Sequence, residues 1–350
     1  MTEFRPLLFF CVVLTLTLAL HTYLGHRLIS PAGFEPGTRR VLWCVLTFAT
    51  LCIPCTFLLL PLSGAVWADR LQWIGYVLMG FWSLALIFVM LRDVAWFSTL
   101  AVQKVLDHEW IPHDPTRRNA LLSSLNVGAI GLTAGFGTAA LIKGSQLASV
   151  VRVRVPIENL PESLRGFTIA QLTDLHVGPT IRSQHMKAVV DTVNSLEPDL
   201  IAVTGDLVDG SVEGLAPHVA PLGTMKARHG SWFVTGNHEY YSGADAWIQH
   251  IRDSLNMKVL LDEHEVLDHD GAQIVVAGVT DITAPRMHAH HYSDAKKAFS
   301  GAPQGDFRLF LAHQPESERG ARGQGVHLQL SGHTHGGQYA PFTWLIHLVK

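Results

Sequence analysis

Long runs of apolar side chains dominate the first 150 residues. Four of them, at about 6–24, 41–60, 71–91 and 120–142, are near the ~20 residues that a helix needs to cross a bilayer. The second and third runs contain no Asp, Glu, Lys or Arg. The fourth is rich in small residues, which closely packed membrane helices need at their contacts. We therefore expect a transmembrane region of about four helices over residues 1–142, followed by a linker at 143–165.

The segment 92–119, between the third and fourth runs, has a pattern of its own. Val94, Phe97, Leu100 and Val105 recur at helical spacing, and charged or amide side chains lie between them. Two interpretations fit this pattern equally well. One is an amphipathic helix at the membrane surface, and the other is an ordinary connecting helix.

After about residue 165, short apolar runs alternate with helical patterns. Strands are expected at 167–172, 200–203, 232–234, 307–311 and 326–330, and a hairpin is expected around Asp270-Gly271, with arms at 265–267 and 273–277. Helices are expected from Ser183 onward and over 244–255. This alternation predicts an α/β sandwich over residues 166–350, a fold class in which ligands gather at the carboxyl ends of strands.

Charge and cysteine content also separate the two halves. Residues 151–350 hold 22 acidic against 16 basic side chains and sixteen of the twenty histidines, a composition that suits bound cations. They offer no basic stripe, so we expect no nucleic-acid partner. All four cysteines lie within the first 55 residues, which excludes a disulfide framework in the second half. Cys52-Ile53-Pro54-Cys55 lies inside an apolar run, without the strand–helix context of a redox motif.

Polar side chains follow five of the predicted strands at the points where those strands end. Any one of these segments could be a structural turn, because Asp, Asn and Gly favour turns. Five in succession, each with metal-ligand side chains, indicate a shared site. They are Thr173-Asp174-Leu175-His176, Gly205-Asp206, Gly236-Asn237-His238-Glu239, His313 and Gly332-His333-Thr334-His335.

This ordered set resembles the calcineurin-like metallophosphoesterase superfamily over about residues 167–340. The long Gly-His-Thr-His-Gly-Gly-Gln form behind membrane spans looks like the membrane-anchored bacterial branch, which is similar to UDP-2,3-diacylglucosamine hydrolase-type enzymes. The resemblance implies a two-sheet β-sandwich flanked by helices. It also implies hydrolysis of a phosphoester or pyrophosphate bond by a hydroxide that bridges two metal ions. The expected location is the bacterial inner membrane.

The resemblance also implies a ligand set and a catalytic residue. The first cation would be bound by Asp174, His176, Asp206 and His335. The second would be bound by Asp206, Asn237, His313 and His333, so that Asp206 bridges the pair. Mixed imidazole and carboxylate ligands suit two divalent ions of Mn, Fe or Zn. His238 would face the substrate as an acid or a stabilising group.

Four further groups of polar residues receive more modest interpretations. Asp209 is expected to be a turn residue rather than a partner of the ligands, and Glu239 is expected to support its loop. Asp281, at the end of a strand, is a candidate for orienting a ligand. The histidine-rich segment 287–291 is more typical of a solvated loop than of a further cation site.

Two features bear on the substrate and on the extent of the domain. Apolar residues at 342–349, close in sequence to His335, are typical either of a membrane-interface segment or of a core segment. Relatives usually continue with more strands past this motif, so the chain either is truncated at its C-terminus or differs at that edge of the sheet. We expect the lipid bilayer and a phosphorylated, lipid-linked substrate as partners.

Three function classes compete at this point. A membrane-anchored metallophosphoesterase ranks above a non-enzymatic, membrane-tethered metal-binding scaffold or sensor, because a scaffold has no use for His238. A transporter ranks last, because the apolar runs hold almost no ionisable residues. Loops 25–40 and 92–119 hold seven basic residues, against five on the other side, which favours a catalytic domain that faces outward.

Overall fold

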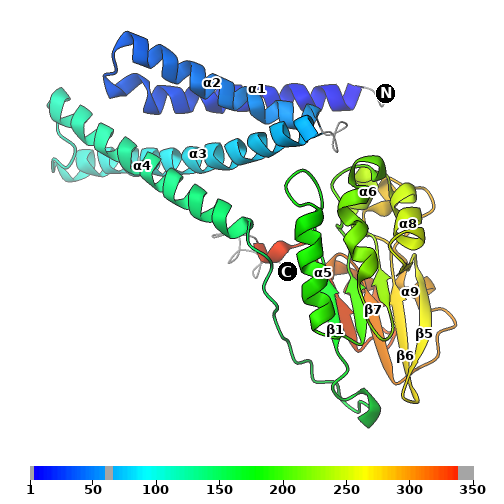
Figure 1. Ribbon diagram of the computed structural model, residues 1–350. Coiled ribbons are helices and arrows are strands. Elements are labelled where there is room, and N and C mark those ends of the chain that lie inside the picture. The colour runs from blue at the N-terminus through cyan, green and yellow to red at the C-terminus, as the bar shows by residue number, and fades with distance from the viewer. Residues whose placement is uncertain (1–3, 60–65, 338–350) are drawn as a thin grey trace. The chain divides into compact units, whose positions relative to one another are not determined.

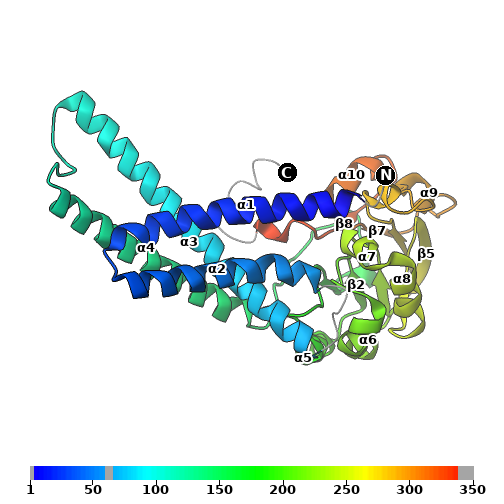
Figure 2. The same cartoon turned by 90° about the horizontal axis from the view of Figure 1, so that it is seen from above.

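Four long helices form the first of the two units into which the computed structural model divides. The structure describes residues 4–59 and 66–337. The segment 342–349 discussed above lies outside the described residues. In Figure 1 the helices run from blue to green, and Figure 2 shows α1 and α2 side by side. Their bounds are α1 (Phe4–Leu28), α2 (Pro36–Leu58), α3 (Val66–Leu106) and α4 (Pro115–Gly144).

Lipid is the solvent that suits the surfaces of these helices. All four are long and apolar enough to cross a membrane. Large apolar side chains remain exposed along them, including Phe48 at 68% and Val127 at 70%. Apolar surface on this scale is unfavourable in water and costs nothing in a hydrocarbon layer.

Helix α3 corrects the interpretation of segment 92–119. It runs without a break from Val66 to Leu106, so residues 92–105 are the continuation of a membrane-type helix and not a separate element. The physical reason is the absence of Gly and Pro between residues 81 and 111, which leaves nothing to stop the helix after the third apolar run.

A buried polar cluster ties three of the helices together. Asp93 of α3 lies 2.6 Å from Nε of Arg27 in α1 and accepts a hydrogen bond of 2.7 Å from the Tyr23 hydroxyl. The Asn126 amide of α4 donates to the Arg27 carbonyl oxygen at 3.1 Å. Ionisable groups within apolar helices need such partners, because water is not available to solvate them.

Two four-stranded sheets form the centre of the second unit. The first has the order β1-β2-β3-β4 and is entirely parallel. The second has the order β5-β6-β7-β8, in which β5 and β6 form an antiparallel hairpin and the other neighbours are parallel. The strands are β1 (Ile169–Leu172), β2 (Leu200–Val203), β3 (Ser231–Phe233), β4 (Met257–Val259), β5 (Glu263–His269), β6 (Ala272–Gly278), β7 (Phe307–Leu311) and β8 (Leu328–Leu330).

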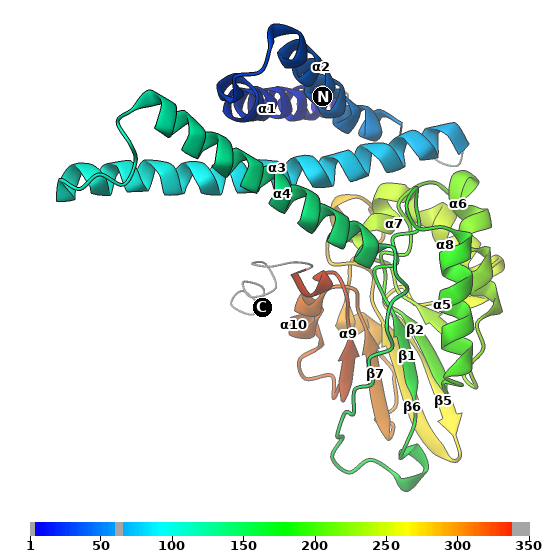
Figure 3. The same ribbon diagram turned by 60° about the vertical axis from the view of Figure 1, so that its left-hand side comes forward.

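Helices cover the outer faces of both sheets (Figure 3). The first sheet is covered by α5 (Ser183–Ser195), α6 (Val212–Val219) and α8 (Ala244–Asp253), and the second by the short α9 (Ala295–Ala298) and α10 (Glu318–Ala321). A further short helix, α7 (Asn237–Ser242), follows β3. The expected two-sheet sandwich flanked by helices is therefore confirmed.

The strands alternate between two apolar layers, which explains their continuous apolar runs. Leu200 and Ala202 of β2 face the layer between the sheets, whereas Ile201 and Val203 pack against the helices. Strand β6 repeats this pattern, with Ile274 directed inward. Residues of a strand that is buried on both faces are apolar throughout, as in all parallel sheets with helices on the outside.

Most of the predicted elements are present within one or two residues of their expected bounds. Strands β2 and β7 match their predictions, and α5 begins at Ser183. Five strands and α-helices of the described residues escaped the sequence pattern, namely β4, α6, α7, α9 and α10. Strand β4 and helix α7 have three and six residues, too few to show a period, and α6 contains Pro217, which normally argues against a helix.

Candidate metal centre

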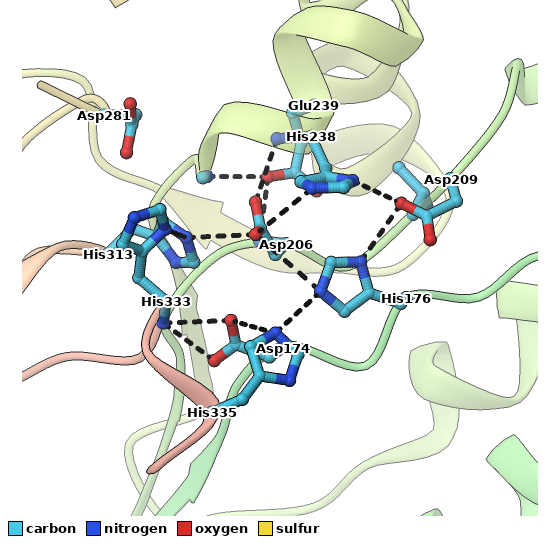
Figure 4. Close-up of polar contacts among 12 residues, drawn as sticks. Asp174, His176, Asp206, Asp209, His238, Glu239, Asp281, His313, His333 and His335 are labelled. Carbon is cyan, nitrogen blue, oxygen red and sulfur yellow. Dashed lines mark hydrogen bonds and ion pairs between the residues drawn. The ribbon is translucent and has the colours of Figure 1, made fainter. Parts of the chain in front are cut away.

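The carboxyl ends of strands from both sheets deliver polar side chains to one place (Figure 4). Asp174 and His176 follow β1, and Asp206 follows β2. His238 is the second residue of α7, the helix that follows β3. From the second sheet, His313 follows β7, and His333 and His335 follow β8. Groups 159 positions apart in sequence, such as His176 and His335, meet here because parallel strands end at a common edge.

Asp206 lies at the centre of this group. It is 2% exposed, and its Oδ2 lies 3.1 Å from Nε2 of His313 and 3.8 Å from Nε2 of His176. Nδ1 of His333 lies 3.2 Å from Nε2 of His313 on one side. The carboxylate thus stands between two groups of imidazoles, which is the position that a bridging ligand requires.

Asp174, His176 and His335 form the second group. Nε2 of His335 lies 3.3 Å from Oδ1 of Asp174 and 3.2 Å from Nε2 of His176. The backbone N–H of His333 donates to the Asp174 carboxylate at 2.9 Å. This bond joins the end of the last strand to the end of the first.

Several of these side chains stand on a backbone in the left-handed region. Asp174, His176 and Asp206 have φ values of 54°, 45° and 52°, and His333 and His335 have φ values of 70° and 48°. This region is uncommon for residues with a Cβ and is tolerated where the surroundings enforce it. Hydrogen bonds among the strand ends, such as that from the His333 N–H to Asp174, hold these residues in the left-handed region. The positions of the site residues therefore determine the backbone conformation here.

Two glycines allow this close approach. A Cβ on Gly236 would lie 2.2 Å from Oδ1 of Asp206, and a Cβ on Gly332 would lie 1.9 Å from Oγ1 of Thr173. A side chain at Gly236 would displace Asp206, after β2, and one at Gly332 would displace Thr173 and Asp174, after β1.

Glu239 supports its loop, as expected, by accepting backbone N–H groups. It is fully buried and receives hydrogen bonds from Asp206 at 3.1 Å, Leu207 at 2.7 Å and Gly236 at 2.6 Å. Burial, reinforced by the charge of Asp206, raises the pKa of Glu239 to about 7, although the N–H groups oppose the shift. The side chain locks the loop after β2 to the start of α7.

Asp209 has a larger role than its sequence context indicated. Its Oδ1 accepts from Nδ1 of His176 at 3.1 Å and from Nδ1 of His238 at 2.5 Å. These bonds turn Nε2 of both rings toward Asp206. Burial opposes the carboxylate charge, but the two imidazoles outweigh it and hold the pKa of Asp209 far below its usual value. The sequence held a signal for this role, because Asp209 lies only three residues after Asp206, in the same segment after β2.

The imidazoles respond to these carboxylates. Burial disfavours the charged form of His238, yet its hydrogen bond to Asp209 and the charge of Asp206 raise its pKa above the usual value. His313 behaves alike, since its contact with Asp206 overcomes burial and raises its pKa to about 9. Nδ1 of His313 donates to the Thr204 carbonyl oxygen at 2.8 Å, which leaves Nε2 for the site.

The residues present fit a pair of divalent cations. Ligands bound at about 2.1 Å stand roughly 3.0–3.4 Å apart in ordinary coordination shells. The contacts of His313 with Asp206 and His333, and of His335 with Asp174 and His176, lie in that range at 3.1–3.3 Å, whereas Nε2 of His176 lies farther from Asp206, at 3.8 Å. Oδ1 of Asn237 is buried without a hydrogen-bond partner. A buried carbonyl oxygen without a partner costs free energy of folding unless a cation or a water molecule binds to it.

Asp281 lies apart from this group (Figure 4). It is buried and accepts from the Gln314 side-chain amide at 2.9 Å and from the Thr283 backbone at 2.8 Å. Because Gln314 directly follows His313, Asp281 fixes the turn that carries this histidine.

Comparison with known proteins agrees with this geometry. The family model for calcineurin-like phosphoesterase matches residues 167–337, the segment that contains both sheets and every residue of the candidate centre. The family's description gives the reaction class, which is hydrolysis of a phosphoester bond.

Individual relatives give the same picture. The chain is 36% identical to a transmembrane protein with metallophosphoesterase domain from Danio rerio, over 63% of this chain and 52% of the relative. The Bos taurus protein of the same description is 37% identical, over 68% of this chain and 55% of the relative. The chain thus spans about half the length of these relatives.

A shorter relative is matched over most of its length. An uncharacterized metallophosphoesterase of Aquifex aeolicus is 30% identical over 54% of this chain and 70% of the relative. With the family model and these relatives together, the chain belongs to the calcineurin-like phosphoesterase family.

Proposed function

We propose that this protein is a membrane-bound hydrolase that cleaves a phosphoester or pyrophosphate bond with the help of two divalent cations. The observation that carries the proposal is the convergence of carboxylates and imidazoles on Asp206. The buried carbonyl oxygen of Asn237, which has no hydrogen-bond partner, adds to it. Family membership supports the reaction class, and the contacts around Asp206 support the assignment of the residues.

The cations would be held by two sets of side chains that share Asp206. The first set is Asp174, His176, Asp206 and His335, and the second is Asp206, Asn237, His313 and His333. A carboxylate shared between two cations reduces their mutual repulsion, and the neutral Asn237 limits the accumulated negative charge. The imidazole-rich donors favour Mn, Fe or Zn over Mg. When bound, the pair supplies an acidified water as nucleophile and neutralises charge on the phosphorus group.

His238 is the residue that we assign to proton transfer. Its Nδ1 is bound to Asp209 at 2.5 Å, and its Nε2 lies 3.9 Å from Oδ2 of Asp206. The side chain is about one third exposed, so Nε2 can reach a substrate oxygen. The raised pKa favours the protonated ring, in which Nε2–H can donate its proton to the leaving oxygen.

The membrane helices support an amphiphilic, lipid-linked substrate. A single transmembrane helix already anchors a protein in an effectively irreversible way, so four long apolar helices exceed what tethering needs. A substrate held in the same bilayer would be presented to the site at high local concentration. Segments 25–40 and 92–119, which include the ends of α1 and α2 and of α3 and α4, hold seven basic residues against five on the other side, and this excess supports a catalytic unit on the outer side.

A substrate panel on the detergent-solubilised full chain tests this proposal. We expect two Mn²⁺ per chain after reconstitution, and Mn²⁺-dependent release of phosphate or alcohol from a phosphomonoester, a phosphodiester or a pyrophosphate-linked lipid. Bound Mn²⁺ with no turnover of any member would favour the metal-binding scaffold. A protein that retains no Mn²⁺, Fe²⁺ or Zn²⁺ would overturn the site assignment.

A further inference from the structure

A second group of metal-ligand side chains lies outside the candidate dimetal centre. Asp245 is in the first turn of α8, and His288 and His291 lie in the segment that follows the short helix Ala284–Arg286. One donor atom from each of the three lies within 4.8 Å of the others. The interpretation of 287–291 as merely a solvated loop does not account for this convergence.

The contacts within the group are too specific for a chance surface arrangement. Nε2 of His288 lies 3.1 Å from Oδ1 of Asp245. The rings of His288 and His291 stack, with centroids 3.9 Å apart and planes at 28°. An ion pair with Asp245, whose side chain is 80% exposed, would hold His288 only weakly and would not bring a second imidazole against it.

Tyr240 supplies the hydrogen bond that metal-binding histidines characteristically make through their other nitrogen. Its hydroxyl lies 2.8 Å from Nδ1 of His291 and 3.1 Å from Oγ1 of Thr235. A hydroxyl can accept from Nδ1–H and donate to Thr235, which fixes the ring and leaves Nε2 as the binding nitrogen. Tyr240 is half-buried in α7, so its hydroxyl is held in place by the fold.

We propose that Asp245, His288 and His291 form a third cation site, selective for Zn²⁺ and similar imidazole-preferring ions. Two imidazoles and one carboxylate are a common protein ligand set for zinc, with a water in the fourth position. Tetrahedral ligands stand about 3.4 Å apart, so the group needs only small side-chain movements to close on an ion. Mn²⁺ binds such a site least well among the first-row ions, so the third site is a zinc site even when Mn²⁺ fills the pair.

Such an ion would join the 284–292 segment to α8 and, through Tyr240, to the helix that carries Asn237 and His238. The site is separate from the dimetal ligands and does not depend on the proposed hydrolysis. Its loading would therefore order the segment beside the candidate centre whatever substrate that centre takes.

Zinc stoichiometry on the full chain in detergent tests the proposal. After loading with Zn²⁺ and removal of free metal, elemental analysis should find three ions per chain for the wild type. It should find two for His288→Asn and for His291→Asn. The matched control is His290→Asn, which changes an exposed neighbour in the same segment outside the three-residue group and should retain three.

A second background separates this proposal from the proposed function. In Asp206→Asn/His313→Ala, where the pair is disabled, one Zn²⁺ should remain, and adding His288→Asn should remove it. Tyr240→Phe should retain three ions at saturation and weaken the third by about 10–100-fold, the usual effect of losing such a hydrogen bond. Equal stoichiometry in the wild type and in correctly folded His288→Asn, judged by circular dichroism, would overturn the third site.

Discussion

One carboxylate oxygen of Asp209 orients two imidazoles of this centre. The same Oδ1 accepts from a proposed metal ligand, His176, and from the proposed acid, His238. Orientation of a ligand and protonation of the acid are therefore coupled through a residue that touches neither cation nor substrate.

Asp209→Asn should therefore change both the rate and its pH dependence. Without the carboxylate charge the pKa of His238 falls, because Asp209 is a principal cause of its elevation. An acid acts only while protonated, so activity is lost as pH rises through this pKa, and the variant should lose activity at lower pH than the wild type. Metal affinity should fall by about 10–100-fold. A pH profile with an unchanged basic limb would contradict this role.

His238→Ala separates proton transfer from metal binding. We expect turnover to fall by ~10²–10⁴ and metal content to stay at the wild-type value, because the imidazole is assigned to the substrate. Elemental analysis and kcat on the same preparation provide the comparison. If the variant lost an ion, His238 would be a ligand and not the acid.

Asp206→Asn, unlike His238→Ala, should impair metal binding. It weakens the one ligand that the two cations share, so both sites should lose affinity together rather than one at a time. Titration with Mn²⁺ should show a parallel weakening of both equivalents. Loss of a single equivalent, with the other bound as in the wild type, would show that Asp206 does not bridge.

At the scale of the elements, the loops after the strands are assembled by close backbone approach. Gly332→Ala should place a Cβ 2.1 Å from Oδ2 of Asp174 and push that carboxylate from its place. We expect about 1–3 kcal/mol of destabilisation and reduced metal content. Gly320→Ala in α10 is the control, since its Cβ would meet only Ala295 at 3.8 Å. Equal metal content in the two variants would refute the steric argument.

The elements also show what can be predicted from a sequence such as this one. Strands β2 and β7 were predictable because they are buried on both faces. Asp206 and His313 could be named as ligand candidates because five strand ends in succession carry such side chains, in an order that resembles a known family. Asp209 was underestimated because a turn is the common role of Asp after a strand, and its two imidazole partners come from distant segments. For the histidine-rich segment 287–291, a solvated loop was preferred to a cation site because Asp245 is distant in sequence, and only the fold brings it to His288 and His291.

For the whole molecule, the membrane helices predict that hydrolysis depends on the lipid surface. In mixed micelles, turnover of a lipid-linked substrate should fall as neutral detergent dilutes it at constant bulk concentration. Turnover of a soluble phosphodiester in the same micelles should not change. This result follows if enzyme and substrate meet in two dimensions. Equal responses of both substrates would show that the helices serve only as an anchor.

The length of α3 has a mechanical consequence. Its 41 residues make a rod of roughly 60 Å at ~1.5 Å per residue, about twice the hydrocarbon thickness of ~30 Å. Tilt within the usual range of up to ~40° does not absorb that excess, so one end must stand clear of the acyl chains. A rod of this kind is a lever. If α3 crosses the bilayer, a change in tilt of about 10°, such as a thinner bilayer can impose, would move one end of the helix by roughly 10 Å relative to the other. A change in bilayer thickness would then be converted into displacement of that end.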